Sequence, residues 1–240
     1  MSNIALVIAG GSGVRMHSSV PKQFLKVYGK PVIAYTLLAF QNHPDIDAIA
    51  VVCIDGWQER LWEYAKEYGI TKLSHVITGG STGQESIRNG IYELEKHYVR
   101  ERERDEEDLV LVHDSIRPLV SAAVISDCIA TALKYGNAIT AIPCQEAMLR
   151  TADGISSLDS VPRASLKRTQ TPQAFKLGEL GDMHRKAEEL GISNSVASCT
   201  LAIELGKTVY FSQGSEKNIK LTTAEDLGLF KAFLRAGEED

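Results

Sequence analysis

The sequence lacks the features that mark several common protein classes. Its cysteines, Cys53, Cys128, Cys144 and Cys199, are widely spaced, with no C-x-x-C pair and no nearby histidine pattern, which argues against a zinc site. The apolar run Ile4–Ala9 is too short to span a membrane. Because this run begins after only three residues, we expect no signal peptide and a reducing, cytoplasmic location.

The chain also has no excess of positive charge. Its formal net charge is −5 at pH 7, which argues against nucleic acid or an anionic membrane as a partner. The one dense charge run, at 100–108, mixes both signs and is interpreted as a solvated helix end and loop. With 240 residues, of which 44% are hydrophobic, the chain is long enough to bury the core of one α/β domain.

Two well-known glycine signatures for nucleotide binding are missing as well. A dinucleotide-binding turn needs G-x-G-x-x-G, but Met16 stands three residues after Gly13, and Asp55 follows about 40 residues after the loop instead of the usual ~20. A P-loop needs G-x-x-x-x-G-K-[ST]. The Gly-Lys-Thr at 206–208 has Leu201 where the first glycine should be. Neither motif is therefore predicted.

A different nucleotide loop is present near the N-terminus. The apolar run that ends at Ala9 predicts a buried first strand. The glycines Gly10, Gly11 and Gly13 follow it and allow backbone N–H groups to approach an anion closely, because no Cβ stands in the way. Arg15 and Lys22 add fixed positive charge just behind this turn. The combination indicates a site for a nucleoside triphosphate.

Strand-like runs alternate with segments of helical periodicity along the chain. This alternation predicts a Rossmann-like α/β fold, in which a mostly parallel, twisted sheet lies between two layers of helices. A capping box at Thr222–Glu225 predicts a last helix that ends near Arg235. The expected strands are Ile4–Ala9, Ala48–Cys53, His75–Thr78, Leu109–Val112, Ala138–Ile142 and Thr208–Phe211, with helices over 33–40, 57–68, 87–98 and 124–133.

The segment from Pro143 to Thr171 has no helical periodicity and predicts an excursion from the main sheet, in the form of a β-arm. We therefore expect one domain over residues 1–240 with an arm subdomain at about 143–171. The arm would leave edge strands and the apolar Met148 and Leu149 in need of cover. Exchange of arms across a two-fold axis would supply that cover, which predicts a homodimer.

Ligands of open α/β sheets bind at the carboxyl ends of strands, so residues there are the first candidates. The third expected strand ends in Gly79, Gly80, Ser81 and Thr82, and Ser86 opens the next helix. These small and hydroxyl-bearing residues suit a base or a ribose, but they equally suit an ordinary turn with a helix N-cap. Both interpretations remain open.

The fourth expected strand ends in His113 and Asp114, with Arg117 three residues further on. A carboxylate directly after a buried strand is well placed to hold Mg²⁺, and Arg117 to bind a phosphate. A structural ion pair between Asp114 and Arg117 is the alternative. For His113 we favour a packing or hydrogen-bonding role.

Six motifs occur in the order typical of one family and span nearly the whole chain. The chain resembles the cytidylyltransferases that make CDP-polyols, namely 2-C-methyl-D-erythritol 4-phosphate cytidylyltransferase and ribitol-5-phosphate cytidylyltransferase. The motifs are AGGSGVRM at 9–16, PKQF at 21–24, GG at 79–80 with Ser86, HDSIRP at 113–118, QTPQAF at 170–175 and NIKLTTAEDL at 218–227.

The resemblance implies roles for these residues. Arg15, Lys22 and Lys220 would be the catalytic cations that contact the triphosphate and the transition state, with Asp114 on the Mg²⁺. Arg163 would reach from the arm into the partner subunit's site. The acceptor side would consist of Arg117, Arg163 and Thr171, and the nucleotide side of Ala9, Gly10, Gly11, Gly13, Gly80, Ser81 and Ser86.

The chain departs from the family pattern mainly on the acceptor side. Glu146-Ala147 stands where the family commonly has Asp-Thr, Gly83 replaces an arginine, and residues 194–197 replace a Thr-Asp pair. The residues on the CTP side are intact. HDSIRP and QTPQAF are closer to the ribitol-phosphate branch than to the methylerythritol branch.

The implied reaction is in-line attack by an acceptor phosphate oxygen on the α-phosphorus of CTP, with release of pyrophosphate. No general base is needed, because a phosphate monoester with a second pKa of about 6 is already largely ionised. We expect a CDP-polyol as product, with ribitol 5-phosphate favoured as acceptor over another polyol or sugar phosphate. Methylerythritol phosphate is the alternative acceptor, and a catalytically weak nucleotide-binding regulatory protein is the alternative from another class.

Overall fold

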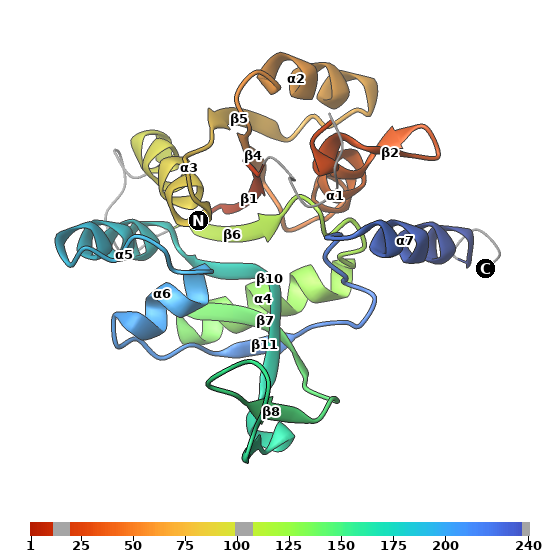
Figure 1. Cartoon of the computed structure of the whole chain (residues 1–240). Coiled ribbons are helices and arrows are strands. Elements are labelled where there is room, and N and C mark those ends of the chain that lie inside the picture. The colour runs from red at the N-terminus through yellow and green to blue at the C-terminus, as the bar shows by residue number, and fades with distance from the viewer. Residues whose placement is uncertain (12–19, 99–107, 237–240) are drawn as a thin grey trace.

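The computed structural model describes residues 1–11, 20–98 and 108–236, and a seven-stranded sheet lies at its centre (Figure 1). The strand order is β11-β7-β10-β6-β1-β4-β5. Neighbouring strands are parallel except at β10, which runs antiparallel to both β6 and β7. The strands are β1 (Asn3–Ala9), β4 (Ala48–Cys53), β5 (Leu73–Thr78), β6 (Leu109–Asp114), β7 (Asn137–Pro143), β10 (Lys167–Lys176) and β11 (Phe211–Gln213).

Helices cover both faces of this sheet, which makes the fold a three-layer α/β/α arrangement. Alternate residues of β1 belong to different cores: Val7 packs with one set of helices and Leu6 with the other. The first set is α1 (Val32–Gln41), α2 (Gln58–Glu67) and α4 (Ala122–Tyr135), and the second is α3 (Gly83–Tyr98), α5 (Leu177–Glu189) and α6 (Ser198–Glu204).

The last helix, α7 (Ala224–Ala236), lies apart from these two layers. Its Phe230 packs with Val27, Ile116 and Leu221 in a third, small cluster. Val27 belongs to a short hairpin, β2 (Lys26–Val27) and β3 (Lys30–Pro31). The α7 cap is shifted by one residue from the predicted box, because the Thr223 hydroxyl accepts from the Asp226 N–H at 3.3 Å.

The predicted α/β class is confirmed, and the first five expected strands are present. They were recognisable because strands covered on both faces are apolar throughout, as in β4, whose six residues are all buried. The sixth expected strand is misplaced: the ladder with β7 begins only at Phe211. Residues 208–210 are held instead by the Asn137 side chain, which bonds the Thr208 carbonyl and the Tyr210 N–H at 3.0 Å each.

Strand β10 and helices α5 and α6 were not predicted. The sequence of β10 is largely polar and contains Pro172, so no apolar run marks it. The register with β7 also shifts between Thr169 and Gln173. Residues 167–171, which the sequence assigned to the arm, thus belong to the main sheet.

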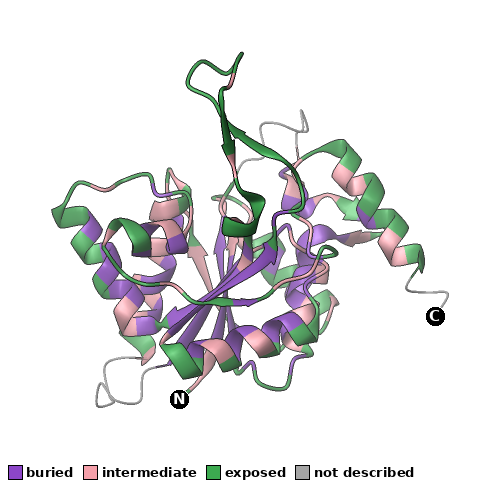
Figure 2. Ribbon diagram, turned by 90° about the horizontal axis from the view of Figure 1, so that it is seen from below, coloured by how far each residue is buried: buried purple, intermediate pink, exposed green. Residues whose placement is uncertain are grey.

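The segment between β7 and β10 projects from the body of the molecule. It contains the hairpin of β8 (Met148–Arg150) and β9 (Asp159–Val161), followed by the 3₁₀ turn η3 (Arg163–Ser165). Figures 1 and 2 show it as a mostly exposed extension beyond the sheet. Ile155 and Leu158 are fully or almost fully exposed, and Leu149 is 65% exposed.

Two further findings concern the expectations from composition. All four cysteines are buried free thiols, and burial raises the pKa of Cys53 to about 12, as expected for a cysteine that packs as a small hydrophobe. Of the helices in the described part of the chain, none is long and apolar enough to cross a membrane.

Candidate active site

Two glycine loops meet at the carboxyl ends of β1 and β5. A Cβ at Gly10 would lie 3.0 Å from the Ser86 Oγ, and a Cβ at Gly79 would lie 3.2 Å from the Gly10 Cα. Ser86 is buried in the first turn of α3, and its Oγ accepts a hydrogen bond from the Gly80 N–H at 3.0 Å. A Cβ at position 10 would crowd the Ser86 side chain and one at position 79 the Gly10 backbone, so glycine at both positions allows this close approach without a shift.

The residues beside this contact have local partners. The Thr82 hydroxyl accepts from the Glu85 N–H at 3.1 Å, so Thr82 caps α3. The N–H and the hydroxyl of Ser81 donate to Glu85 Oε2 at 2.7 and 2.5 Å. These bonds, the hydroxyl's first, hold the pKa of Glu85 below its usual range. The predicted turn and helix N-cap are thus present, with Thr82 as the cap, and the roles of Gly80, Ser81 and Ser86 toward the nucleoside stay predictions.

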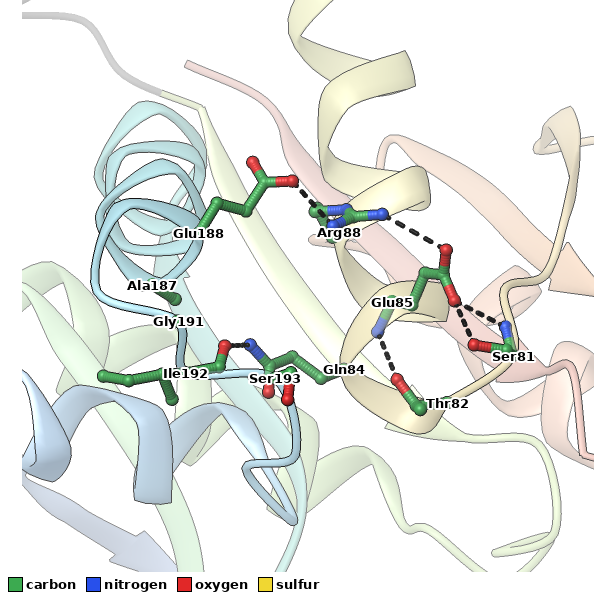
Figure 3. Close-up of a pocket in the computed structure, with 10 residues that line it drawn as sticks. All are labelled: Ser81, Thr82, Gln84, Glu85, Arg88, Ala187, Glu188, Gly191, Ile192 and Ser193. Carbon is green, nitrogen blue, oxygen red and sulfur yellow. Dashed lines mark hydrogen bonds and ion pairs between the residues drawn. The ribbon is translucent and has the colours of Figure 1, made fainter.

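Ser81 and Thr82 also line a cavity of about 280 Å³ between the start of α3 and the segment after α5 (Figure 3). Arg88 spans its wall and pairs with Glu85 at 3.3 Å and with Glu188 at 2.7 Å. The charged groups of this cavity are therefore paired with one another, and they hold α3 to α5.

A buried glutamine fixes the first glycine loop from its side. Gln23 lies in the 3₁₀ turn η2 (Lys22–Phe24), and its Nε2 donates to the carbonyls of Ala9 and Gly11 at 2.8 and 3.0 Å. Lys22 directly precedes it, so the same turn places the lysine next to the loop. Sequence reasoning gave Gln23 no role, although an amide donor inside the PKQF motif was a usable signal.

Gly13 and Arg15 lie outside the described residues, so their predicted contacts with the triphosphate stay predictions.

Three charged side chains converge at the carboxyl end of β6. Asp114 Oδ2 accepts from Arg117 Nε at 3.0 Å, and Asp114 Oδ1 accepts from Lys220 Nζ at 3.0 Å. Burial alone would raise the pKa of Asp114, but Lys220 and Arg117 outweigh it and hold the pKa below its usual range. Asp114 is thus a carboxylate at neutral pH. The predicted ion pair of Asp114 with Arg117 is present, and the metal role stays a prediction.

The Lys220 segment is anchored next to this cluster by Asn218, which is fully buried. The Asn218 carbonyl accepts from Arg117 Nη1 at 2.8 Å, and its Nδ2 donates to the Thr171 carbonyl at 2.8 Å. Hydrogen bonds thus join three segments that lie about 50 to 100 residues apart in the sequence, at Asp114, Thr171 and Lys220. Asn218 was quoted in a motif but was not recognised as an anchor.

His113 is fully buried, as expected for a packing or hydrogen-bonding residue. Its ring meets Phe40 edge-on, with centroids 5.0 Å apart. Burial lowers the pKa of His113 to about 4, so the imidazole is neutral at physiological pH. Both ring nitrogens have partners, Thr171 Oγ1 at 3.0 Å and the Arg117 carbonyl at 3.2 Å.

A second cavity, of about 320 Å³, opens beside the charged cluster. Asp114, Arg117, Thr171 and Lys220 belong to its wall, and so does Gly83, where a Cβ would meet nothing within 4 Å. The remaining lining is Ile8, Ile87, Val112, His113, Thr169, Gln170, Gln173 and residues 196–198. Charge and uncharged hydrogen-bonding groups thus share one concave site, which suits a phosphorylated, hydroxyl-rich ligand.

Arg163 is the one described candidate from the acceptor side that lies outside this cavity. It is exposed on the arm, where its Nη1 donates to the Gln145 carbonyl at 3.1 Å. Glu146, which replaces the aspartate of the family pattern, pairs with Arg168 at 3.4 Å. The predicted action of Arg163 in a partner subunit stays a prediction.

The comparisons with known proteins agree with this geometry. The family model described as IspD, 2-C-methyl-D-erythritol 4-phosphate cytidylyltransferase, matches residues 3–236. Ribitol-5-phosphate cytidylyltransferase of Lacticaseibacillus paracasei is 44% identical over 236 residues, covering 98% of each chain. 2-C-methyl-D-erythritol 4-phosphate cytidylyltransferase of Syntrophotalea carbinolica is 36% identical and covers 98% of this chain and 97% of its own.

A solved structure extends the likeness to the fold. The crystal structure of the Francisella tularensis 2-C-methyl-D-erythritol 4-phosphate cytidylyltransferase superposes with a TM-score of 0.76 at 25% identity, over 97% of this chain and 99% of that one. The chain belongs to the IspD family of cytidylyltransferases. It is therefore a nucleotidyltransferase, and the predicted family is confirmed.

Proposed function

We propose that this chain transfers CMP from CTP to ribitol 5-phosphate, or to a close polyol phosphate, with release of pyrophosphate. The observation that carries the proposal is the cavity beside Asp114, where Arg117 and Lys220 lie next to hydroxyl and amide groups. The similarity to ribitol-5-phosphate cytidylyltransferases over almost the whole chain favours ribitol over methylerythritol.

In the proposed arrangement CTP lies on the glycine loops. Backbone N–H groups at Gly10 and Gly11, with Gly13 and Arg15 beyond them, would bind the triphosphate, and Gly80, Ser81 and Ser86 would lie near the nucleoside. Lys22, placed beside the loop by Gln23, would stabilise the charge that develops on the oxygens of the α-phosphorus.

The acceptor phosphate would lie in the cavity, bound by Arg117 and Lys220. Its oxygen would attack the α-phosphorus in line and displace pyrophosphate, so that one P–O bond forms as another breaks. The protein would hold the acceptor phosphate next to the triphosphate of CTP and neutralise both, because two phosphate groups otherwise repel each other.

A divalent cation fits the residues present. In the described part of the chain no cluster of three or more potential metal ligands occurs, so Asp114 would act as a single carboxylate, with phosphate oxygens and waters as further ligands. Among the described residues its Oδ1 accepts from Lys220, whose side chain is 43% exposed and so reaches the surface where a phosphate would enter. When bound, Mg²⁺ would neutralise phosphate charge and polarise the α-phosphorus.

We further propose a homodimer in which the arm completes the partner's site. The exposed Leu149, Ile155 and Leu158 on the arm support this, because such residues favour cover by another surface. Arg163 would then contact the acceptor phosphate of the other subunit. A reducing, cytoplasmic setting is part of the proposal and is supported by the four buried thiols.

The acceptor is tested by pyrophosphate release from CTP with a panel of ribitol 5-, methylerythritol 4-, glycerol 3- and glucitol 6-phosphates. The highest kcat/KM is expected with ribitol 5-phosphate. A higher value with methylerythritol 4-phosphate would overturn the acceptor assignment, and no release with any member would overturn the function.

The arm is tested by mixing Arg163→Ala protein with Lys22→Ala protein. If sites are shared between subunits, a mixed dimer has one site with both residues intact, so activity should partly return after subunit exchange. A monomer in solution, or exchanged subunits without recovery, would contradict the proposal.

A further inference from the structure

The backbone ladder between β6 and β10 ends just before the charged cluster. Its last pair is Val112 with Gln173, and beyond it the N–H of Asp114 has no ladder acceptor. The hydroxyl of Thr171 takes that place, because Asp114 N donates to Thr171 Oγ1 at 3.1 Å. On the β10 side a side chain thus holds the backbone of Asp114 where the ladder has ended, while on the other side Asp114 still pairs with Ile8 of β1.

The proton of this hydroxyl is also committed. The Arg117 carbonyl can only accept a hydrogen bond, so His113 Nε2, which lies 3.2 Å from it, carries the hydrogen of the neutral ring. Nδ1 is then the acceptor of the ring, so the Thr171 hydroxyl donates to it at 3.0 Å while the same oxygen accepts from Asp114 N. The distances are consistent with one continuous chain of hydrogen bonds and with a single tautomer of the neutral imidazole.

These hydrogen bonds hold both ends of the turn at residues 114–117. Asp114 is held through its N–H and Arg117 through its carbonyl, while a backbone bond of 3.0 Å joins the Arg117 N–H to the Asp114 carbonyl. The turn carries the side chains of Asp114 and Arg117, which pair with each other and both line the cavity. Asp114 also pairs with Lys220.

We propose that Thr171 and His113 are positioning residues that act as one unit: their hydrogen bonds fix the turn carrying Asp114 and Arg117, and the Thr171 hydroxyl serves the protein, not the acceptor. This inference rests on the proposed function, because it assigns what the turn is positioned for. It also changes the role that family resemblance implied for Thr171.

A mutant cycle tests the unit. Thr171→Val keeps the shape and removes the hydroxyl, which should lower kcat/KM about 10- to 100-fold. His113→Gln keeps a donor for the Arg117 carbonyl near the position of Nε2 but places no acceptor at the position of Nδ1, which faces Thr171. The kcat/KM of the double variant should lie within about threefold of that of the less active single variant, because both changes break the same series of hydrogen bonds. Thr171→Ser should restore most of the activity.

A matched control is available in the next strand. Thr140 is fully buried in β7, and its hydroxyl donates at 2.7 Å to the carbonyl of Pro172, the residue after Thr171, and not to a group of Asp114, His113 or Arg117. Thr140→Val makes the same isosteric change and loses two buried hydrogen bonds, the one to the Pro172 carbonyl and the one of 3.4 Å that Thr140 Oγ1 accepts from Ser212 Oγ. It should lower stability but leave kcat/KM within about threefold of the unmodified protein.

A readout without substrate separates this inference from the proposed function. The ¹⁵N spectrum of the His113 ring should show unprotonated Nδ1 and protonated Nε2 in the protein alone, and the Nδ1 signal should shift in Thr171→Val. A ring protonated on Nδ1 would overturn the inference even in an active enzyme. So would a double variant whose loss of kcat/KM equals the product of the losses in the two single variants. An enzyme inactive with every acceptor would overturn the proposed function and leave the ¹⁵N result to decide the hydrogen-bond chain.

Discussion

The two sides of the site are built by different means. On the β1 and β5 side the geometry depends on missing side chains, since a Cβ at Gly10 or Gly79 would force a shift of the Ser86 side chain or of the facing loop. On the β6 and β10 side it depends on side chains that bond one another across the sheet, from Asp114 to Thr171 and Lys220. In the proposed function, the nucleotide would thus be bound by backbone groups and fixed charge, and the acceptor by a side-chain network.

The largest effect is expected from removing charge on the glycine side. Lys22→Ala should lower turnover about 100-fold or more, because it removes a positioned cation that acts mainly in the transition state. Lys26→Ala, at an exposed position of the neighbouring hairpin, is the control and should change little. Steady-state kinetics with saturating CTP and acceptor measure both. Near-normal turnover of Lys22→Ala would show that this side binds without catalysing.

The next effect is expected from the carboxylate on the opposite side. Asp114→Asn keeps the size of the side chain and loses the charge that holds Lys220, Arg117 and the proposed metal. Its kcat should fall about 10- to 100-fold and its requirement for Mg²⁺ should rise. A chelator should abolish the activity of the unmodified protein, and added Mg²⁺ should restore it. Full activity in chelator would contradict the metal role of Asp114.

A smaller effect is expected from adding a methyl group to the glycine contact. Gly79→Ala places a Cβ 3.2 Å from the Gly10 Cα, so one loop must shift, at a cost of about 1–3 kcal/mol in stability and with a higher KM for CTP. Gly228→Ala in α7 is the matched control, because a Cβ there meets nothing within 4 Å. It should leave the KM for CTP unchanged. Equal effects of the two variants would refute the steric argument.

The smallest effect compares two buried histidines, only one of which lies in the site. Burial lowers the pKa of both His113 and His184 to about 4. Because the unfolded chain takes up these protons at higher pH, stability should fall as the pH drops from about 6.5 toward 4, by up to about 3 kcal/mol per histidine. His113→Gln and His184→Gln should each flatten this pH dependence in denaturant titrations.

Activity at pH 7 should separate the two variants, since His184 lies on α5, away from the cavity. His184→Gln should retain near-normal kcat/KM, whereas His113→Gln should not. A comparable loss in both would indicate a general effect of destabilisation instead of a positioned turn.

The two sides also differ in how far the sequence predicts them. The glycine side consists of short contiguous motifs, so the local pattern indicated an anion site at Gly10, whereas the predicted nucleotide role of Gly80 and Ser86 depended on the family resemblance. Asp114 and Arg117 were found for the same reason, because they end an apolar strand. Their dependence on Thr171 and Asn218 could not be predicted, because those bonds join residues about 50 and 100 positions apart in the chain.

The same limit explains the errors in the fold. Strands covered on both faces, such as β4, are recognisable from composition. Strand β10 is polar and contains Pro172, and its place in the sheet depends on pairing with β6 and β7. The role of Gln23 was missed because its partners are carbonyl groups, which no sequence pattern displays.

The direction of group transfer can be measured with an isotope. Ribitol 5-phosphate carrying ¹⁸O in its phosphate is incubated with CTP, Mg²⁺ and the unmodified protein, and the products are resolved by ³¹P NMR and mass spectrometry. If the acceptor oxygen attacks the α-phosphorus of CTP, all of the label stays in the CDP-polyol, with one ¹⁸O in the new bridge, and the pyrophosphate is unlabelled. Label in pyrophosphate, or a product without a labelled bridge, would contradict the proposed chemistry of the site.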